Sequence, residues 1–176
     1  YGGIIMPLIG TNNIIQKQVL QTAVHHSYSG GSSFTELSSN YRVSITPKFQ
    51  NSLIFLEYFI PLNQYSSGHN NIFGFSGYRY APSQAGLDSR GQGLGSRKQF
   101  AGGNCRAQNG YDINDHNIEY FIAYDAPNTT SACSYGFQMY QEGSDAGTIY
   151  VAHSNGNNST WGMSSRVIIT ASEIKQ

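Results

Sequence analysis

No stretch of this chain carries a sustained apolar repeat of 3.6 residues, the period that the buried face of an α-helix requires. The apolar residues come instead in short runs separated by Gly, Asn and Ser. The run from 41 to 46 is the most regular, because Tyr41, Val43 and Ile45 alternate with polar residues. Successive side chains of a strand point to opposite faces, so this run predicts a half-buried strand. We therefore expect an all-β fold.

Seven or eight such runs follow one another, separated by turns of uneven length. That pattern favours an antiparallel two-sheet sandwich, and the jelly roll is the eight-stranded form common in viral proteins. Leu53 to Ile60, interrupted only by Glu57, predicts a strand buried on both faces. The expected strands are residues 14–23, 41–46, 53–60, 72–80, 117–125, 135–141, 148–153 and 165–174. The residues expected in the sandwich interior are Leu53, Phe55, Ile122, Phe137 and Ile169.

Two segments depart from the strand pattern. Residues 1–13 are apolar but broken by glycines and Pro7, and we expect a connector or a segment that packs against a neighbouring chain. Because the chain starts at Tyr1 rather than Met, we expect a fragment or the ordered end of a longer polypeptide. Residues 14–176 are expected to form the sandwich. Within them, 82–116 is rich in Gly, Ser, Gln and Arg and predicts a long loop, which in a compact domain is commonly functional.

Charge and apolar content constrain the partners. Charged residues make up 11% of the sequence, against about a quarter in ordinary soluble domains, and the net charge is zero. Nucleic acid and anionic membranes require a basic surface, so we expect neither as a partner. No apolar run approaches the roughly 20 residues of a membrane span. Low charge with abundant apolar strand residues indicates more buried surface than one domain provides, which predicts a homotrimer with a partly apolar interface.

The carboxylates give little evidence for catalysis. Asp112 and Asp115 with His116, or Glu119 and Asp125, offer the kind of pair that hydrolyses glycosides. Solvent-facing charges commonly fill such strand positions. The sequence contains no nucleophile elbow, phosphate-binding glycine loop or His-Glu-x-x-His motif. We therefore expect no enzymatic activity and no cofactor.

Cysteine and histidine give no metal motif. Cys105 and Cys133 are the only cysteines. One disulfide is possible between them, but two free thiols are expected if the protein assembles in a cytoplasm. The five histidines are scattered, so we expect surface or hydrogen-bonded side chains and no bound metal.

Four segments carry a family resemblance. They are the strand-like Lys17–Thr22, the strand, Pro-containing turn and apolar strand of Val43–Glu57, the turn Asp125–Ser131 before Tyr135, and the closing Trp161–Ile174. In this order, over residues 14–174, they resemble the C-terminal domain found in tail fibres and head fibres of tailed bacteriophages, especially cyanophages and marine phages. The resemblance implies a trimeric β-sandwich on the surface of the virion, attached to other virion proteins of the tail or the capsid and often in contact with the host. Segment 82–116 departs from that pattern.

The resemblance leaves several functions open. The first is the outer domain of a homotrimeric tail fibre or spike that binds a host surface glycan. The second is a capsid head fibre or decoration protein with an assembly or stabilising role, and the third is a monomeric carbohydrate-binding module.

Host contact is expected at the segment from Ser83 to His116 and beside it. Tyr combines a flat apolar ring with a polar hydroxyl, and the planar guanidinium of Arg suits acidic or hydroxyl-rich glycans. The same side chains would equally serve to brace the loop. The candidate receptor-binding residues are Tyr78, Arg79, Tyr80, Arg90, Arg97, Arg106 and Tyr111.

Overall fold

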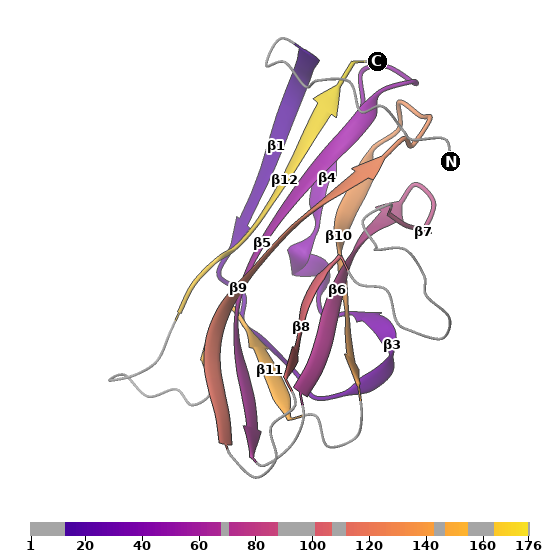
Figure 1. Cartoon of the computed structure of the whole chain (residues 1–176). Coiled ribbons are helices and arrows are strands. Elements are labelled where there is room, and N and C mark those ends of the chain that lie inside the picture. The colour runs from indigo at the N-terminus through magenta and orange to yellow at the C-terminus, as the bar shows by residue number, and fades with distance from the viewer. Residues whose placement is uncertain are drawn as a thin grey trace.

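A computed structural model describes residues 13–67, 71–87, 101–106, 112–142, 147–154 and 164–175 of the chain. Within these ranges the chain forms antiparallel strands and one short 3-10 helix, Ser39–Tyr41. The strands form two sheets that face each other as a sandwich (Figure 1). The expected all-β sandwich is therefore confirmed.

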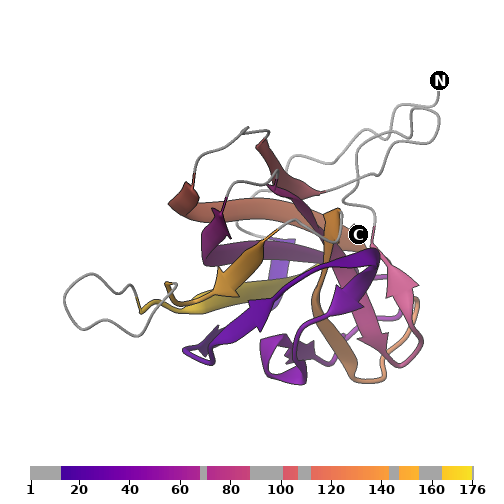
Figure 2. The ribbon, with the colours of Figure 1, turned by 90° about the horizontal axis from the view of Figure 1, so that it is seen from below.

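The first sheet contains the first and last strands of the chain as neighbours. Its order is β1-β12-β5-β11-β2, and β9 pairs with β5 on the other side. Seen from below, β9 lies along one rim of the molecule with β5 beside it (Figure 2). The strands are β1 (Ile14–Thr22), β2 (His26–Tyr28), β5 (Leu53–Ser67), β9 (Asp112–Asp125), β11 (Thr148–Val151) and β12 (Val167–Ile174).

The second sheet has β10 and β6 at its centre. Its order is β3-β10-β6-β7, while β4 also pairs with β10 and β8 with β6. The strands are β3 (Gly31–Glu36), β4 (Val43–Ile45), β6 (Asn71–Ala81), β7 (Ala85–Gly86), β8 (Gly102–Arg106) and β10 (Cys133–Glu142).

The segment 82–116, expected to be a long loop, contains β7, β8 and the first residues of β9. Two further strands, β2 and β3, lie outside the expected strand ranges. Gly103 shows why β8 has no apolar signature. A Cβ atom there would lie 2.4 Å from the carbonyl oxygen of Phe73, and its φ is +150°, so β8 approaches β6 more closely than a side chain would allow. The strand forms through backbone pairing with β6.

The sandwich interior is formed by alternate residues of each strand. In β5, Ile54, Leu56 and Tyr58 are fully buried, whereas Leu53 and Phe55 are only half-buried. The prediction that this strand is buried on both faces is therefore wrong. Within the second sheet, Phe75 and Phe137 pack with a centroid distance of 5.5 Å, and within the first the Tyr58 and Phe121 rings stack at 4.4 Å. Across the sandwich, the rings of Phe75 and Phe121 lie 6.4 Å apart.

The prediction of the core residues is correct for two of them and wrong for three. Phe137 and Ile169 are buried, with 2% and 0% of their surface exposed. Leu53, Phe55 and Ile122 lie on the outer face of the first sheet instead, because the register places them on the opposite side from Ile54 and Ala123. Ile122 is 38% exposed.

The 3-10 turn Ser39–Tyr41 is the helical part of the described chain. No helix in the described residues has the length and apolarity of a membrane span.

Candidate functional site

An ion pair between Arg79 and Asp125 joins the two sheets. Arg79 lies on β6 and Asp125 ends β9, so the pair spans the sandwich. The Arg79 Nη1 donates to both oxygens of Asp125, at 3.0 and 2.7 Å. Each side chain is only 12% exposed, so water screens the pair weakly.

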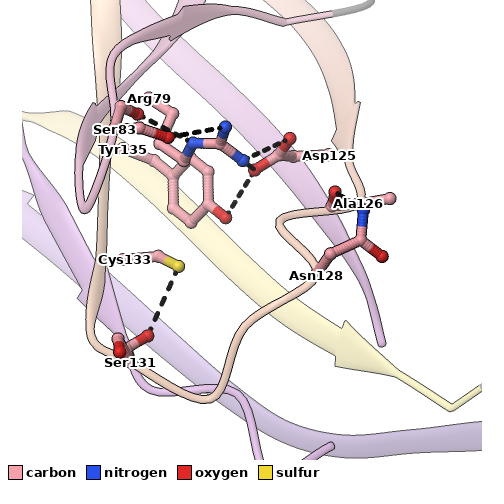
Figure 3. A network of polar contacts seen from close by, with 8 residues as sticks. All are labelled: Arg79, Ser83, Asp125, Ala126, Asn128, Ser131, Cys133 and Tyr135. Carbon is pink, nitrogen blue, oxygen red and sulfur yellow. Dashed lines mark hydrogen bonds and ion pairs between the residues drawn. The ribbon is translucent and has the colours of Figure 1, made fainter. Parts of the chain in front are cut away.

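Tyr135 and Ser83 complete this cluster, which we call the Arg79 network. The Tyr135 hydroxyl donates to Oδ2 of Asp125 at 2.8 Å. The Arg79 Nε donates to the carbonyl oxygen of Ser83 at 3.0 Å, and Nη2 contacts the Ser83 hydroxyl at 3.3 Å. Figure 3 shows these side chains pointing toward one another. The Asp125 carboxylate thus connects β9 to β10 through Tyr135, and to β6 and the turn after it through Arg79.

The acidity of the neighbouring groups argues for bracing rather than nucleophilic chemistry. Burial raises the pKa of the Tyr135 hydroxyl, and the negative charge of Asp125 raises it further. Burial also raises the pKa of the Cys133 thiol, which lies 3.5 Å from the carbonyl oxygen of Ser131. Both groups are therefore protonated at neutral pH, whereas a cysteine nucleophile requires a thiolate. Cys133 is free and buried, which confirms a free thiol at this position.

Three candidate binding residues are consecutive on β6 and divide between its faces. Arg79 points inward to the network, while Tyr78 and Tyr80 lie on the outer face with their ring centroids 4.9 Å apart. The Tyr80 ring carries the Arg42 guanidinium at 4.0 Å, and its hydroxyl donates to the carbonyl oxygen of Phe137. Tyr78 is less engaged, with its hydroxyl 3.4 Å from Oε1 of Gln84.

A glycine makes room for Tyr80. A Cβ atom at Gly136 would lie 3.1 Å from Cε2 of Tyr80 and 2.7 Å from the carbonyl oxygen of Tyr41. Arg42, which covers the ring, also forms an ion pair with Glu36 at 2.6 Å. The Tyr80 ring is therefore packed between the backbone at Gly136 and the guanidinium of Arg42, which is paired with Glu36.

The remaining candidate binding residues are not placed. Arg90, Arg97 and Tyr111 lie outside the described residues, and Arg106 belongs to β8 while its side chain is not described. Their role in binding stays a prediction.

The carboxylates considered for catalysis do not converge where they are described. Glu119 and Asp125 share one face of β9 but are six residues apart, which is roughly 20 Å along a strand. A glycosidase pair is at most about 9.5 Å apart, so these two do not form one. The side chains of Asp112 and Asp115 are not described, and His116 is exposed.

A second polar cluster, centred on Glu173, was not predicted. Glu173 is fully buried on the inner face of β12. Its Oε1 accepts hydrogen bonds from the Ser52 hydroxyl at 2.6 Å and from the backbone amides of Lys48 and Phe49, and its Oε2 accepts one from Gln16. Burial by itself raises the pKa of Glu173, but these hydrogen bonds outweigh that effect and lower the pKa below its ordinary value of 4.5. The carboxylate anchors the turn 46–52 to the first sheet.

Replacing Glu173 with Gln is expected to lower the free energy of unfolding by about 2–3 kcal/mol, because an amide nitrogen would face donors that the carboxylate now satisfies. Chemical denaturation at neutral pH measures this loss. Because the native pKa is lowered, the stabilisation is complete above pH 4.5 and disappears as the pH falls through the native value, so wild type and variant converge in acid. The control is Glu36→Gln, whose partly exposed ion pair contributes about 1 kcal/mol or less. Equal losses in the two variants would contradict the anchoring role.

Two histidines that are far apart in sequence are brought together. The rings of His25 and His153 stack with centroids 4.9 Å apart, and the Tyr150 ring meets His153 edge-on at 5.0 Å. Burial and the neighbouring His25 lower the pKa of His153. In the described part of the chain, no group of three or more potential ligands is arranged to hold a metal ion.

Comparison with known proteins adds no family: no protein-family model matches the chain, and a search of curated proteins finds no match.

Proposed function

We propose that this chain is a structural virion module, the outer domain of a homotrimeric phage tail fibre or spike that binds a surface glycan of the host. The observation that carries the proposal is the Arg79 network. In this network the buried charges near the candidate binding residues join the two sheets. Such bracing suits a rigid scaffold that presents loops.

The strand order supports the jelly-roll form of this module. One sheet has the order β1-β12-β5-β9 and the other the order β3-β10-β6-β8, so that the first and last strands are neighbours at one edge of the first sheet. Viral capsid and lectin domains use this two-sheet form. The four segments that resemble fibre domains in the same chain order support its place on a virion.

The test concerns segment 82–116. Replacing Arg90 and Arg97 with Ala is expected to lower binding to an array of bacterial surface polysaccharides by about tenfold or more, because two guanidinium contacts are lost. Mass photometry of the same samples is expected to show an unchanged trimer. Arg166→Ala, an exposed arginine outside the segment, serves as the control.

The other outcomes separate the alternatives. Unchanged polysaccharide binding with an intact trimer would favour a capsid decoration protein. A wild type that binds as a monomer would favour a free carbohydrate-binding module. A trimer weakened by the substitutions would mean that the segment braces the assembly.

A further inference from the structure

The outer face of the first sheet is largely apolar on β5 and β9, and β12 and β1 add Ile168 and Val19 among polar side chains. The register places its side chains in rows that run from β1 through β12 and β5 to β9. We call this surface the open face. Its rows are Lys17, Ser172, Phe55 and Tyr124; Val19, Thr170, Glu57 and Ile122; and Gln21, Ile168, Phe59 and Tyr120, with Ile118 beyond them on β9.

Its apolar side chains are exposed to an extent unusual for their size. On β9, Ile118 is 60% exposed and Tyr120 is 59% exposed, and on β1, at the opposite edge of the rows, Val19 is 56% exposed. Between them, Phe55 and Phe59 on β5 are half-buried, and Thr170 and Ser172 on β12 are buried. A contiguous apolar patch over β5 and β9 is typical of a protein contact rather than of a solvated surface.

The open face carries almost no charge. Its described rows include one carboxylate, Glu57, and one ammonium group, Lys17. The Tyr120 hydroxyl donates to Oε1 of Glu57 at 3.1 Å, so the carboxylate has a partner within the face. Such a surface offers nothing to select a strongly charged partner. It suits another apolar face, as in the interfaces of homo-oligomers.

The size of the open face fits a closed assembly of three copies. Four strands spaced by about 4.8 Å make a face roughly 19 Å wide, and the nine residues from Leu53 to Pro61 make it about 30 Å long. Three such faces around an axis form a triangular prism whose walls lie about 5.5 Å from the axis, close to half of the roughly 10 Å between packed sheets. One layer of side chains would therefore fill the interior.

We infer that the open face packs against the same face of two further copies of this chain, forming a prism around a threefold axis. The inference rests on the proposed homotrimer and specifies its interface. The β9 edge of one copy, with Ile118 and Tyr120, meets the β1 edge of the next, with Val19, and so buries the exposed apolar side chains of both. Glu57, near the middle of the face, is brought toward its two counterparts.

The experiment places a charge on each edge of the open face. Ile118→Arg and Val19→Arg, tested separately by analytical ultracentrifugation over a concentration series, are each expected to raise the dissociation constant of the trimer about tenfold or more, because an unpaired guanidinium would be buried. Both positions are exposed in the single chain, so its circular dichroism spectrum is expected to be unchanged. Ser44→Arg is the control, since it places the same charge at an exposed strand position on the other sheet.

A second variant tests whether Glu57 lies near the threefold axis. Glu57→Gln removes a charge that the prism brings near two copies of itself while keeping an oxygen for the Tyr120 hydroxyl, so it is expected to lower the dissociation constant. Weaker association in this variant would contradict the prism.

The remaining outcomes distinguish the two proposals. A wild-type trimer that neither arginine variant weakens would overturn the inference and leave the proposed function intact. A wild type that is monomeric at all concentrations would defeat the homotrimer itself. Dimers instead of trimers, or an assembly that forms only after residues 1–12 are deleted, would overturn the prism, because the face would then have a different occupant.

Discussion

Replacing Asp125 with Ala is expected to lower the free energy of unfolding by about 3–5 kcal/mol, the range observed when one partner of a buried ion pair is removed. The substitution leaves the Arg79 guanidinium, which is 12% exposed, without its carboxylate. It also removes the acceptor of the Tyr135 hydroxyl. Urea denaturation followed by circular dichroism measures the loss.

Two further variants separate charge from hydrogen bonding. Tyr135→Phe removes one donor and leaves the ion pair in place, so about 1 kcal/mol is expected. Combining Asp125→Leu with Arg79→Met removes both charges and is expected to recover much of the stability lost in Asp125→Ala. If Asp125→Ala were no more destabilising than Tyr135→Phe, the ion pair would not join the sheets energetically.

The sequence predicts individual strands better than it predicts the pairing between them. The run from 41 to 46 alternates between apolar and polar residues, and its expected buried positions, Tyr41, Val43 and Ile45, are buried. β8 escaped prediction because its stability comes from a distant partner strand and from glycines that let the backbones approach. The residues of β8 alone give no signal for either effect.

The Arg79 network was missed although a signal for half of it exists. Phe73, Phe75 and Gly77 point inward along β6, so Arg79 is the next inward position. A charged residue in phase with a buried face predicts a buried partner. The identity of that partner was not predictable, because Asp125 lies 46 residues away on the other sheet. Glu173 follows the same logic, two residues beyond the buried Ala171 on β12.

The orientation of β5 was not predictable for a different reason. Residues 53–60 are apolar at both odd and even positions, with Glu57 as the exception, so no alternation marks the inward side. In the structure, the one charged residue of this run, Glu57, marks the outer face. Glu57 shares the outer face with Leu53 and Phe55, while Ile54, Leu56 and Tyr58 form the core.

This difference predicts unequal losses of stability for two identical truncations. Phe137 is 2% exposed and packs on Tyr41 and Phe75 at centroid distances of 5.4 and 5.5 Å, so Phe137→Ala is expected to cost about 3–5 kcal/mol of unfolding free energy through the cavity that it leaves. Phe55 is half-buried on the open face, with the Tyr124 ring at 5.1 Å, and Phe55→Ala is expected to cost the isolated chain about 1 kcal/mol.

Both variants delete the same atoms, so the difference between them reports the environment alone. Chemical denaturation below the concentration at which the chain associates gives the cost to one copy. Repeating it well above that concentration is expected to raise the cost of Phe55→Ala, because its ring would then be buried between copies, while the cost of Phe137→Ala stays constant. Equal losses for the two variants in the dilute sample would place Phe55 in the core after all and contradict the assigned faces of β5.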